Sequence, residues 1–321
     1  MSKFNVSDIS RKVLLDSKYD LAVLCCGYEP RCTFLSEIID KTNINDVLVY
    51  SYSEHADMLH RKSIDSFFVN KFESKNIYRH SSADTQGQFN RLYQWADTID
   101  LKSKDKLRVL IDYSSMTKSL LSIIIFFFLK FIQKDNKIDI SIDFSYSVGE
   151  YPEIIEHKNF SQPLILQGCE GSPLTFTKKA ALFLLGFDSV GPQVINNAIN
   201  PDKSYGIYAS PSAKESYVEN VLAFNSEFID SNLGGKNKLL GLPLTNVTVC
   251  FDYLNQIISP LKSDCNISIA LFGPKPHVLA SILTANYHRN VTCIHCKALD
   301  FEPRLVQGIG ELVLTRLDFS I

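Results

Sequence analysis

Residues 111–131 read IDYSSMTKSLLSIIIFFFLKF, where a short strand-like segment is followed by a polar turn and then by an apolar run. The near-continuous apolar part, residues 119–132, spans only 14 residues and contains Lys130, whereas a membrane-spanning helix needs about 20. We therefore predict a helix buried inside a globular domain. The polar residues 112–118 then lie at the carboxyl end of a buried strand.

The composition indicates a globular protein with enough residues for two domains. The chain has 321 residues, of which 45% are hydrophobic and 21% are charged, and a domain usually spans about 100–200 residues. The net charge of −2, without a basic block, argues against a grip on long nucleic acid. It permits a small nucleotide as ligand.

The amino terminus and the cysteines indicate the cellular compartment. Residues 1–20 lack the apolar core of a signal peptide. The eight cysteines are scattered along the chain, which fits reduced thiols better than a disulfide framework. We therefore expect a cytoplasmic protein that is not associated with a membrane.

The first half of the chain alternates strand-like and helix-like segments. The predicted strands cover residues 19–27, 46–52, 76–82, 106–115 and 138–147. Helical patterns cover residues 32–41, 58–72 and 87–99, and the apolar run supplies a fourth helix. This alternation predicts an α/β fold, with a parallel sheet and helices on both of its faces.

The second half repeats the first. Five segments match in order, four of them at offsets between 150 and 161 residues. The matches pair Gly186 with Gly27, Tyr208 with Tyr50, Gly273 with Asp112, Phe301 with Tyr151, and the terminal ELVLTRL with PLILQG of residues 163–168. The alternative is that any two α/β halves resemble one another when they are aligned by eye.

The repeat predicts two tandem Rossmann-like units with parallel sheets. Residues 167–173, QGCEGSP, are typical of a linker, so we place the first unit at residues 1–172 and the second at 173–321. Fused repeats of this kind usually pack as an intramolecular pseudo-dimer, which is the arrangement we expect here.

Ligands of open parallel sheets bind outside the carboxyl ends of the strands, so the turns at those ends are the candidate sites. In the turn CGYEPR, Gly27 allows a tight bend, followed by Tyr28 and Glu29. Arg31 of this turn can hold a phosphate or carboxylate with two hydrogen bonds. Alternatively, Glu29 and Arg31 are charges at the start of a helix in a solvated turn.

The polar turn before the apolar helix is the second candidate. The hydroxyls of Ser114, Ser115 and Thr117 and the charge of Lys118 surround a helix start, where backbone N–H groups favour anions. Asp112 would repel a phosphate, so we expect it to bind a ribose hydroxyl or to orient Lys118. Alternatively, one of these hydroxyls only caps the helix.

The matching turns of the second half are the remaining candidates. FGPKPH contains Gly273, Lys275 and His277 in a stretch that two prolines stiffen. His277 is a candidate hydrogen-bonding group, or a helix-start histidine without a task. The turn YASPSAKES offers Ser210 as a weaker candidate.

Common motifs for cofactors and metals are missing from the sequence. Neither half contains G-x-G-x-x-G or a Walker loop, and no G-x-S-x-G elbow occurs. The CIHC of residues 293–296 has half the spacing of a zinc site, without a second cysteine pair to complete it. We therefore predict no cofactor and no metal ion.

The stretch VLIDYSSMTKSL, residues 109–120, resembles the signature turn of CARF domains. In that turn, a strand ends in Asp, small or hydroxyl residues follow, and Thr-Lys opens a helix. Ser115 and Met116 stand where that family has Gly-Gly, and FGPKPH departs from the pattern. The related SAVED domains fuse two such Rossmann-like units in one chain, and the resemblance extends over almost the whole sequence.

The resemblance implies a sensor that binds cyclic oligonucleotides in bacterial antiphage defence. CARF and SAVED proteins normally carry an effector module, and this chain has no room for one, so the resemblance implies a separate effector protein. The alternative is an enzyme of the same shape, a metal-independent nucleotide hydrolase or phosphodiesterase. In that case His277 or Lys118 would be the general acid and Glu29 or Asp112 the base. A third option is an assembly subunit with vestigial pockets.

Overall fold

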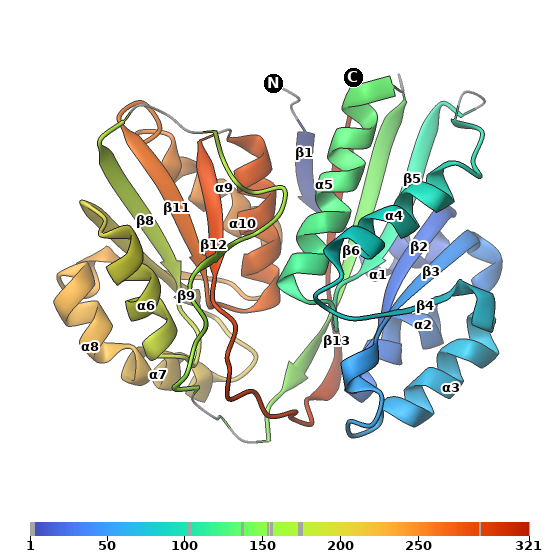
Figure 1. The fold of residues 1–321 in the computed structure, drawn as a ribbon, viewed down its shortest axis with the longest axis horizontal. Helices are drawn as coiled ribbons and strands as arrows, with labels where there is room; N and C mark the ends of the chain where they lie inside the picture. The colour runs from blue at the N-terminus through green and yellow to red at the C-terminus, as the bar shows by residue number, and fades with distance from the viewer. Residues whose placement is uncertain are drawn as a thin grey trace. The chain divides into compact units, whose positions relative to one another are not determined.

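The computed structural model describes residues 4–101, 104–135, 138–152, 154, 157–172, 176–288 and 290–320. The chain forms two compact units, each an α/β fold built on one mixed, mostly parallel sheet. The first unit contains the chain up to residue 152 and the segment from residue 303 onward, and the second contains residues between them. The predicted fold class is confirmed at this level (Figure 1).

The sheet of the first unit has seven strands in the order β1-β13-β6-β5-β2-β3-β4. Five of them run parallel: β2 (Tyr19–Cys26), β3 (Ile44–Tyr52), β4 (Ile77–His80), β5 (Lys106–Asp112) and β6 (Asp139–Glu150). β13 (Gln307–Phe319) lies antiparallel to β6, and β1 (Phe4–Asp8) lies antiparallel to β13.

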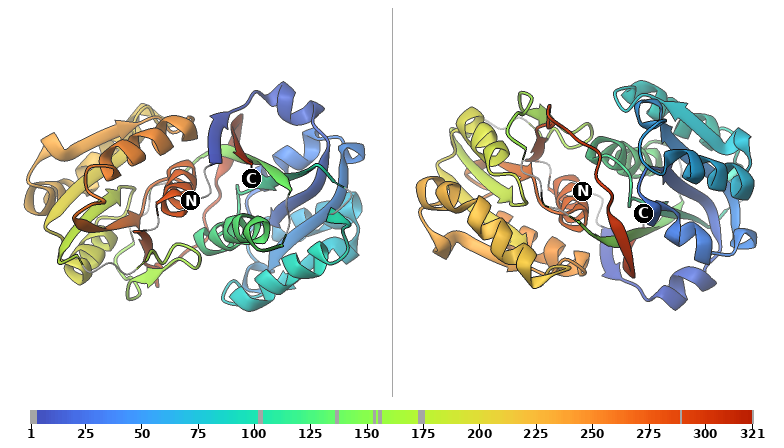
Figure 2. Two further views of the ribbon diagram at one scale, coloured as in Figure 1. Left: turned by 90° about the horizontal axis from the view of Figure 1, so that it is seen from above. Right: turned by 90° about the horizontal axis from the view of Figure 1, so that it is seen from below.

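Helices cover both faces of this sheet (Figures 1 and 2). α1 (Arg11–Asp16), α2 (Phe34–Ile38) and α3 (Arg61–Phe72) share one core with the strands through Leu14, Leu35 and Phe68. α4 (Thr85–Ala96) and α5 (Lys118–Asp135) pack together through contacts such as Trp95 against Phe128. α5 is the predicted buried helix, and no helix in the described part of the chain is long and apolar enough to cross a membrane.

The sheet of the second unit has six strands in the order β10-β9-β8-β11-β12-β7. The parallel strands are β8 (Lys178–Leu184), β9 (Lys203–Ala209), β10 (Leu239–Leu242), β11 (Cys265–Leu271) and β12 (Val291–His295). The two-residue β7 (Leu164–Ile165) lies antiparallel to β12.

Five helices accompany this second sheet. α6 (Val190–Ile199), α7 (Glu215–Phe224) and α8 (Ser226–Phe228) share a core with the strands. α9 (Val247–Ile258) and α10 (Lys275–Tyr287) pack against each other, as α4 and α5 do in the first unit.

The two sheets have the same strand order. Positions β6-β5-β2-β3-β4 of the first sheet correspond to β12-β11-β8-β9-β10 of the second, and each central strand is the first parallel strand of its half. The next strand along the chain in each half is antiparallel and joins the sheet of the other unit: β7 follows β6, and β13 follows β12. Of the two matched segments, PLILQG contains β7 and ELVLTRL lies within β13.

The exchange makes the unit boundaries differ from those predicted. Residues 303–320 belong to the sheet of the first unit, not to a second unit of residues 173–321, and β7 belongs to the second. Arg316 of β13 holds the Asp143 carboxylate of β6 with two hydrogen bonds, at 2.6 and 2.7 Å. Tyr19 of β2 donates a further hydrogen bond to Asp143, at 2.8 Å. Backbone pairing and this buried charge cluster fix the last strand in the first sheet.

Candidate functional site

The candidate turns of the first unit lie side by side at the carboxyl ends of β2 and β5. A Cβ atom on Gly27 would lie only 2.5 Å from Ser115 Oγ, so the absence of a side chain allows the two turns to touch. The second unit repeats this contact, because a Cβ on Gly186 would collide with the backbone carbonyl of Phe272 beside Gly273. The predicted pairing of these glycines with equivalent strand ends therefore agrees with both sheets.

Arg31 is the most strongly organised charged side chain of this site. It belongs to η1 (Pro30–Thr33) and is 5% exposed. Its Nε donates to Glu29 at 2.7 Å, and its Nη1 donates to the Tyr146 hydroxyl at 2.9 Å and to the Ser147 carbonyl at 3.1 Å. Nη2 forms no hydrogen bond with the described residues, so it is available to an anion.

Two glycines make room for the Arg31 side chain. Gly149 of β6 and Gly308 of β13 are partners across the strand pair. A Cβ on Gly149 would lie 3.0 Å from Arg31 Cδ, and one on Gly308 would lie 3.1 Å from Arg31 Cβ. The alternative of a solvated helix-start arginine is therefore not what the structure shows.

The turn after β5 is held together by its own polar groups. Asp112 Oδ1 accepts hydrogen bonds from the Ser114 backbone N–H at 3.0 Å and from the Ser114 hydroxyl at 2.5 Å. The Ser114 hydroxyl in turn accepts from the backbone N–H of Ser147 at 2.8 Å. Both Asp112 and Ser114 are buried, so these hydrogen bonds brace the turn against β6.

Thr117 is the residue that caps α5. Its hydroxyl accepts from the Leu120 N–H at 3.1 Å, and Tyr52 approaches both its hydroxyl and its backbone N–H. The capping alternative therefore describes Thr117. It leaves out the Ser115 and Ser147 hydroxyls, whose buried oxygen atoms have no hydrogen-bond partner among the described residues. Lys118 is half-buried at the first position of the helix.

Three further residues beside Arg31 extend the site. Burial and the Glu29 carboxylate raise the pKa of Tyr28, and the charges of Arg31 and Arg304 oppose that rise. Burial and Tyr146 likewise raise the pKa of Tyr151, against Arg31 and Arg304. Both arginines thus act on the same two phenols. The sequence pattern did not reveal Arg304, because only the exchange of β13 brings its segment into this unit.

In the second unit, His277 is part of the core. It is 1% exposed on α10, and its Nε2 lies 3.2 Å from the carbonyl oxygen of Pro243, which accepts a hydrogen bond from it. Burial lowers the pKa of His277 to about 4, so the ring is neutral at neutral pH. Its role as a general acid remains a prediction that this burial does not favour.

The other candidates of the second unit lie just after β9 and at the start of α10. Ser210 precedes a cis bond to Pro211, and its backbone N–H donates to the Leu242 carbonyl at 2.7 Å. Lys275 is half-buried at the start of α10. Around Gly273 the strand ends are filled by aromatic rings: the Phe272 ring packs against Gly191 and Phe160.

Two of the three predicted catalytic side chains are held by neighbouring groups of the first unit. Glu29 is engaged by Arg31 and Asp112 by Ser114, while His277 belongs to the other unit. Within the described ranges, no three His, Cys, Asp or Glu side chains gather as metal ligands would. The geometry of the first unit is suited to holding an anion through Arg31 and neighbouring hydroxyls.

No family model matches the sequence, and no curated protein is significantly similar to it.

Proposed function

We propose that the protein is a nucleotide-binding sensor whose ligand-binding site is the carboxyl end of the first sheet. One observation carries the proposal: Arg31 is buried and oriented by three partners, yet its Nη2 has no hydrogen-bond partner among the described residues. A buried guanidinium is costly unless it is fully hydrogen-bonded. An anionic oxygen at Nη2 would complete the set with a charge-assisted bond.

The surrounding groups support a phosphate as that anion. The Ser115 and Ser147 hydroxyls lack partners among the described residues, and each can donate one hydrogen bond. Lys118 and the first N–H groups of α5 add positive potential beside them. Tyr28 and Tyr151 supply aromatic surface, so the ligand we propose carries both phosphate and an aromatic base.

The ligand class follows the resemblance to CARF and SAVED domains. We propose a cyclic oligonucleotide, with the two units packed as a pseudo-dimer and a separate effector protein that responds to binding in antiphage defence. The equal strand orders of the two sheets support the duplicated origin on which this proposal depends. The hydrolase alternative has less support, because the geometry leaves His277 neutral and buried.

Calorimetric titration with a panel of cyclic and linear oligonucleotides tests the proposal. We expect one cyclic member to bind and to be recovered intact by mass spectrometry, and Arg304→Gln to weaken its binding. Lys75→Gln is the matched control, because this exposed cation precedes β4 and so lies at the amino end of that strand. Absence of binding across the panel, or equal binding by the Arg304→Gln protein, would contradict the proposal; turnover would favour the hydrolase.

A further inference from the structure

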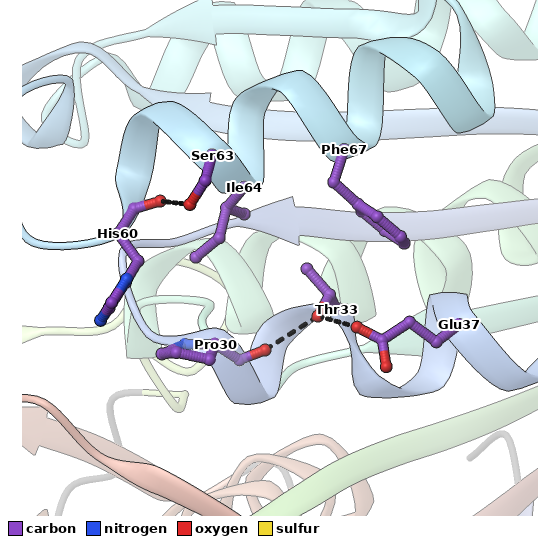
Figure 3. Close-up of a pocket in the computed structure, with 7 residues that line it drawn as sticks. All are labelled: Pro30, Thr33, Glu37, His60, Ser63, Ile64 and Phe67. Carbon is purple, nitrogen blue, oxygen red and sulfur yellow. Dashed lines mark hydrogen bonds between the residues drawn. The ribbon is translucent and has the colours of Figure 1, made fainter.

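A cavity of about 250 Å³ lies in the first unit between α3 and the segment formed by η1 and α2 (Figure 3). Side chains of α3 face those of η1 and α2 across it. Its lining residues are Pro30, Thr33, Glu37, His60, Ser63, Ile64 and Phe67. None of these residues belongs to the anion site described above, although Pro30 and Thr33 share η1 with Arg31.

The lining divides into apolar and polar parts. Pro30, Ile64 and Phe67 provide hydrocarbon surface, which favours the body of a small organic molecule. Glu37 and His60 are its ionisable side chains, and no lysine or arginine lines the cavity. The carboxylate of Glu37 therefore sets the sign of the charge that this cavity favours.

The Thr33 hydroxyl lies within hydrogen-bond distance of two acceptor oxygen atoms but can donate to only one of them at a time. The Thr33 hydroxyl lies 2.9 Å from the Pro30 carbonyl and 2.5 Å from Glu37 Oε1. A hydroxyl has one hydrogen, so it cannot fully satisfy both oxygen atoms. Thr33 is buried, whereas Pro30 and Glu37 are exposed residues that a ligand in the cavity can reach.

Lys71, a cation on which the Glu37 charge acts, does not supply a hydrogen bond to the Glu37 carboxylate in the described contacts. Burial lowers the pKa of Lys71, and the carboxylates of Glu37 and Asp40 oppose that shift. The Lys71 ammonium nevertheless donates to the backbone carbonyls of Ser36 and Ile39. The Glu37 carboxylate is left to accept a donor from the cavity.

We infer that this cavity binds a small organic ammonium ion. Its N–H groups would meet the Glu37 carboxylate, and its short apolar body would cover Ile64 and Phe67. The inference does not depend on the proposed nucleotide site. It assigns the first unit a second ligand, beside the short helix η1 that carries Arg31.

Three probes of similar size but different charge test the inference on the full chain. They are 2-phenylethylamine, which is cationic at pH 7, the neutral 2-phenylethanol, and the anionic 3-phenylpropanoate, each titrated by calorimetry to about 10 mM. We expect the amine to bind at millimolar concentration and the other two to bind at least about threefold more weakly, the gain of one partly exposed charge pair. Equal affinities for the three probes, or no binding of the amine, would overturn the inference.

Two matched carboxylate variants locate the binding. Glu37→Gln keeps an acceptor for Thr33 but removes the charge, and we expect it to weaken amine binding about three- to fivefold. Asp57→Asn removes an exposed carboxylate that pairs with Lys62 outside the cavity, and we expect no change. Unchanged affinity in a folded Glu37→Gln protein, or an equal loss in Asp57→Asn, would place the amine elsewhere and contradict the inference.

Discussion

The two units share one strand order but differ in what lies at the carboxyl ends of their strands. In the first unit, the buried Arg31 lies near the contact between Gly27 and Ser115. The Ser115 and Ser147 hydroxyls at this end have no hydrogen-bond partner among the described residues. In the second unit, the ring of Phe272 packs beside the corresponding contact. The same framework therefore supports a polar, anion-accepting end in one unit and an aromatic end in the other. The shared strand order fixes where a site can form, and the local side chains decide whether one does.

The largest difference we expect concerns the strand that the first unit receives from the second half of the chain. Asp143→Ala would leave the Arg316 guanidinium and the Tyr19 hydroxyl without their shared partner. Breaking a buried ion pair typically costs about 3–5 kcal/mol, which urea unfolding would detect. The control is Asp57→Ala, which removes an exposed ion pair with Lys62 and should cost less than about 1 kcal/mol. Equal losses would show that the Asp143 cluster does not secure β13.

The second largest effect we expect is a pH dependence of the free energy of unfolding, caused by His277 of the second unit. Because burial lowers the pKa of His277 from 6.5 to about 4, the unfolded chain binds the proton more readily than the folded chain. The contribution of His277 is complete above pH 6.5 and is lost as the pH falls towards 4, by up to about 3 kcal/mol.

Urea unfolding between pH 7.5 and 4.5 would measure this contribution. We expect His277→Gln to be less stable at neutral pH, but with a smaller loss on acidification than the unsubstituted protein. An unchanged pH dependence would show that His277 is not buried in its neutral form.

The two glycine contacts should respond differently to a methyl group. In Gly186→Ala the new Cβ meets the backbone carbonyl of Phe272, which cannot rotate away, whereas in Gly27→Ala it meets the Ser115 side chain. Overpacking costs about 1–3 kcal/mol, so we expect Gly186→Ala near the upper value and Gly27→Ala near the lower. Thermal unfolding compares them, and Ser115→Gly should restore the stability of Gly27→Ala. A larger loss in Gly27→Ala would reverse the comparison.

Substitution of the two helix-start lysines, Lys118 and Lys275, compares the contributions of the two units to ligand affinity. A charge-assisted bond to a ligand is worth about 1.5–3 kcal/mol, so Lys118→Ala should weaken nucleotide binding roughly ten- to a hundredfold with little change in melting temperature. The sequence repeat alone predicts the same loss for Lys275→Ala. The aromatic end of the second unit predicts a smaller one. Equal losses in calorimetry would mean that both strand ends bind the ligand.

Several features of this structure follow from local patterns in the sequence. The alternation of segments predicted the α/β class, and the length of the apolar run predicted that α5 is buried inside a domain. Gly27 and Gly186 marked the tight strand ends, because a glycine after an apolar strand is a local signal.

Other features depend on contacts between distant parts of the chain. The pattern of ELVLTRL predicts a strand, but not which sheet it joins, so the exchange of β7 and β13 was missed. The room for Arg31 comes from Gly149 and Gly308, and Arg304 arrives with the exchanged segment. The burial of His277 is set by its packing against the loop that contains Pro243. Period and spacing carry no information about these pairings.

Hydrogen–deuterium exchange in the presence of a bound oligonucleotide tests the central claim most directly. The account predicts protection in peptides that cover residues 27–34, 112–120 and 145–151 of the first unit, with residues 272–280 of the second unit unchanged. Protection centred on residues 272–280, or none at the strand ends of the first unit, would contradict it.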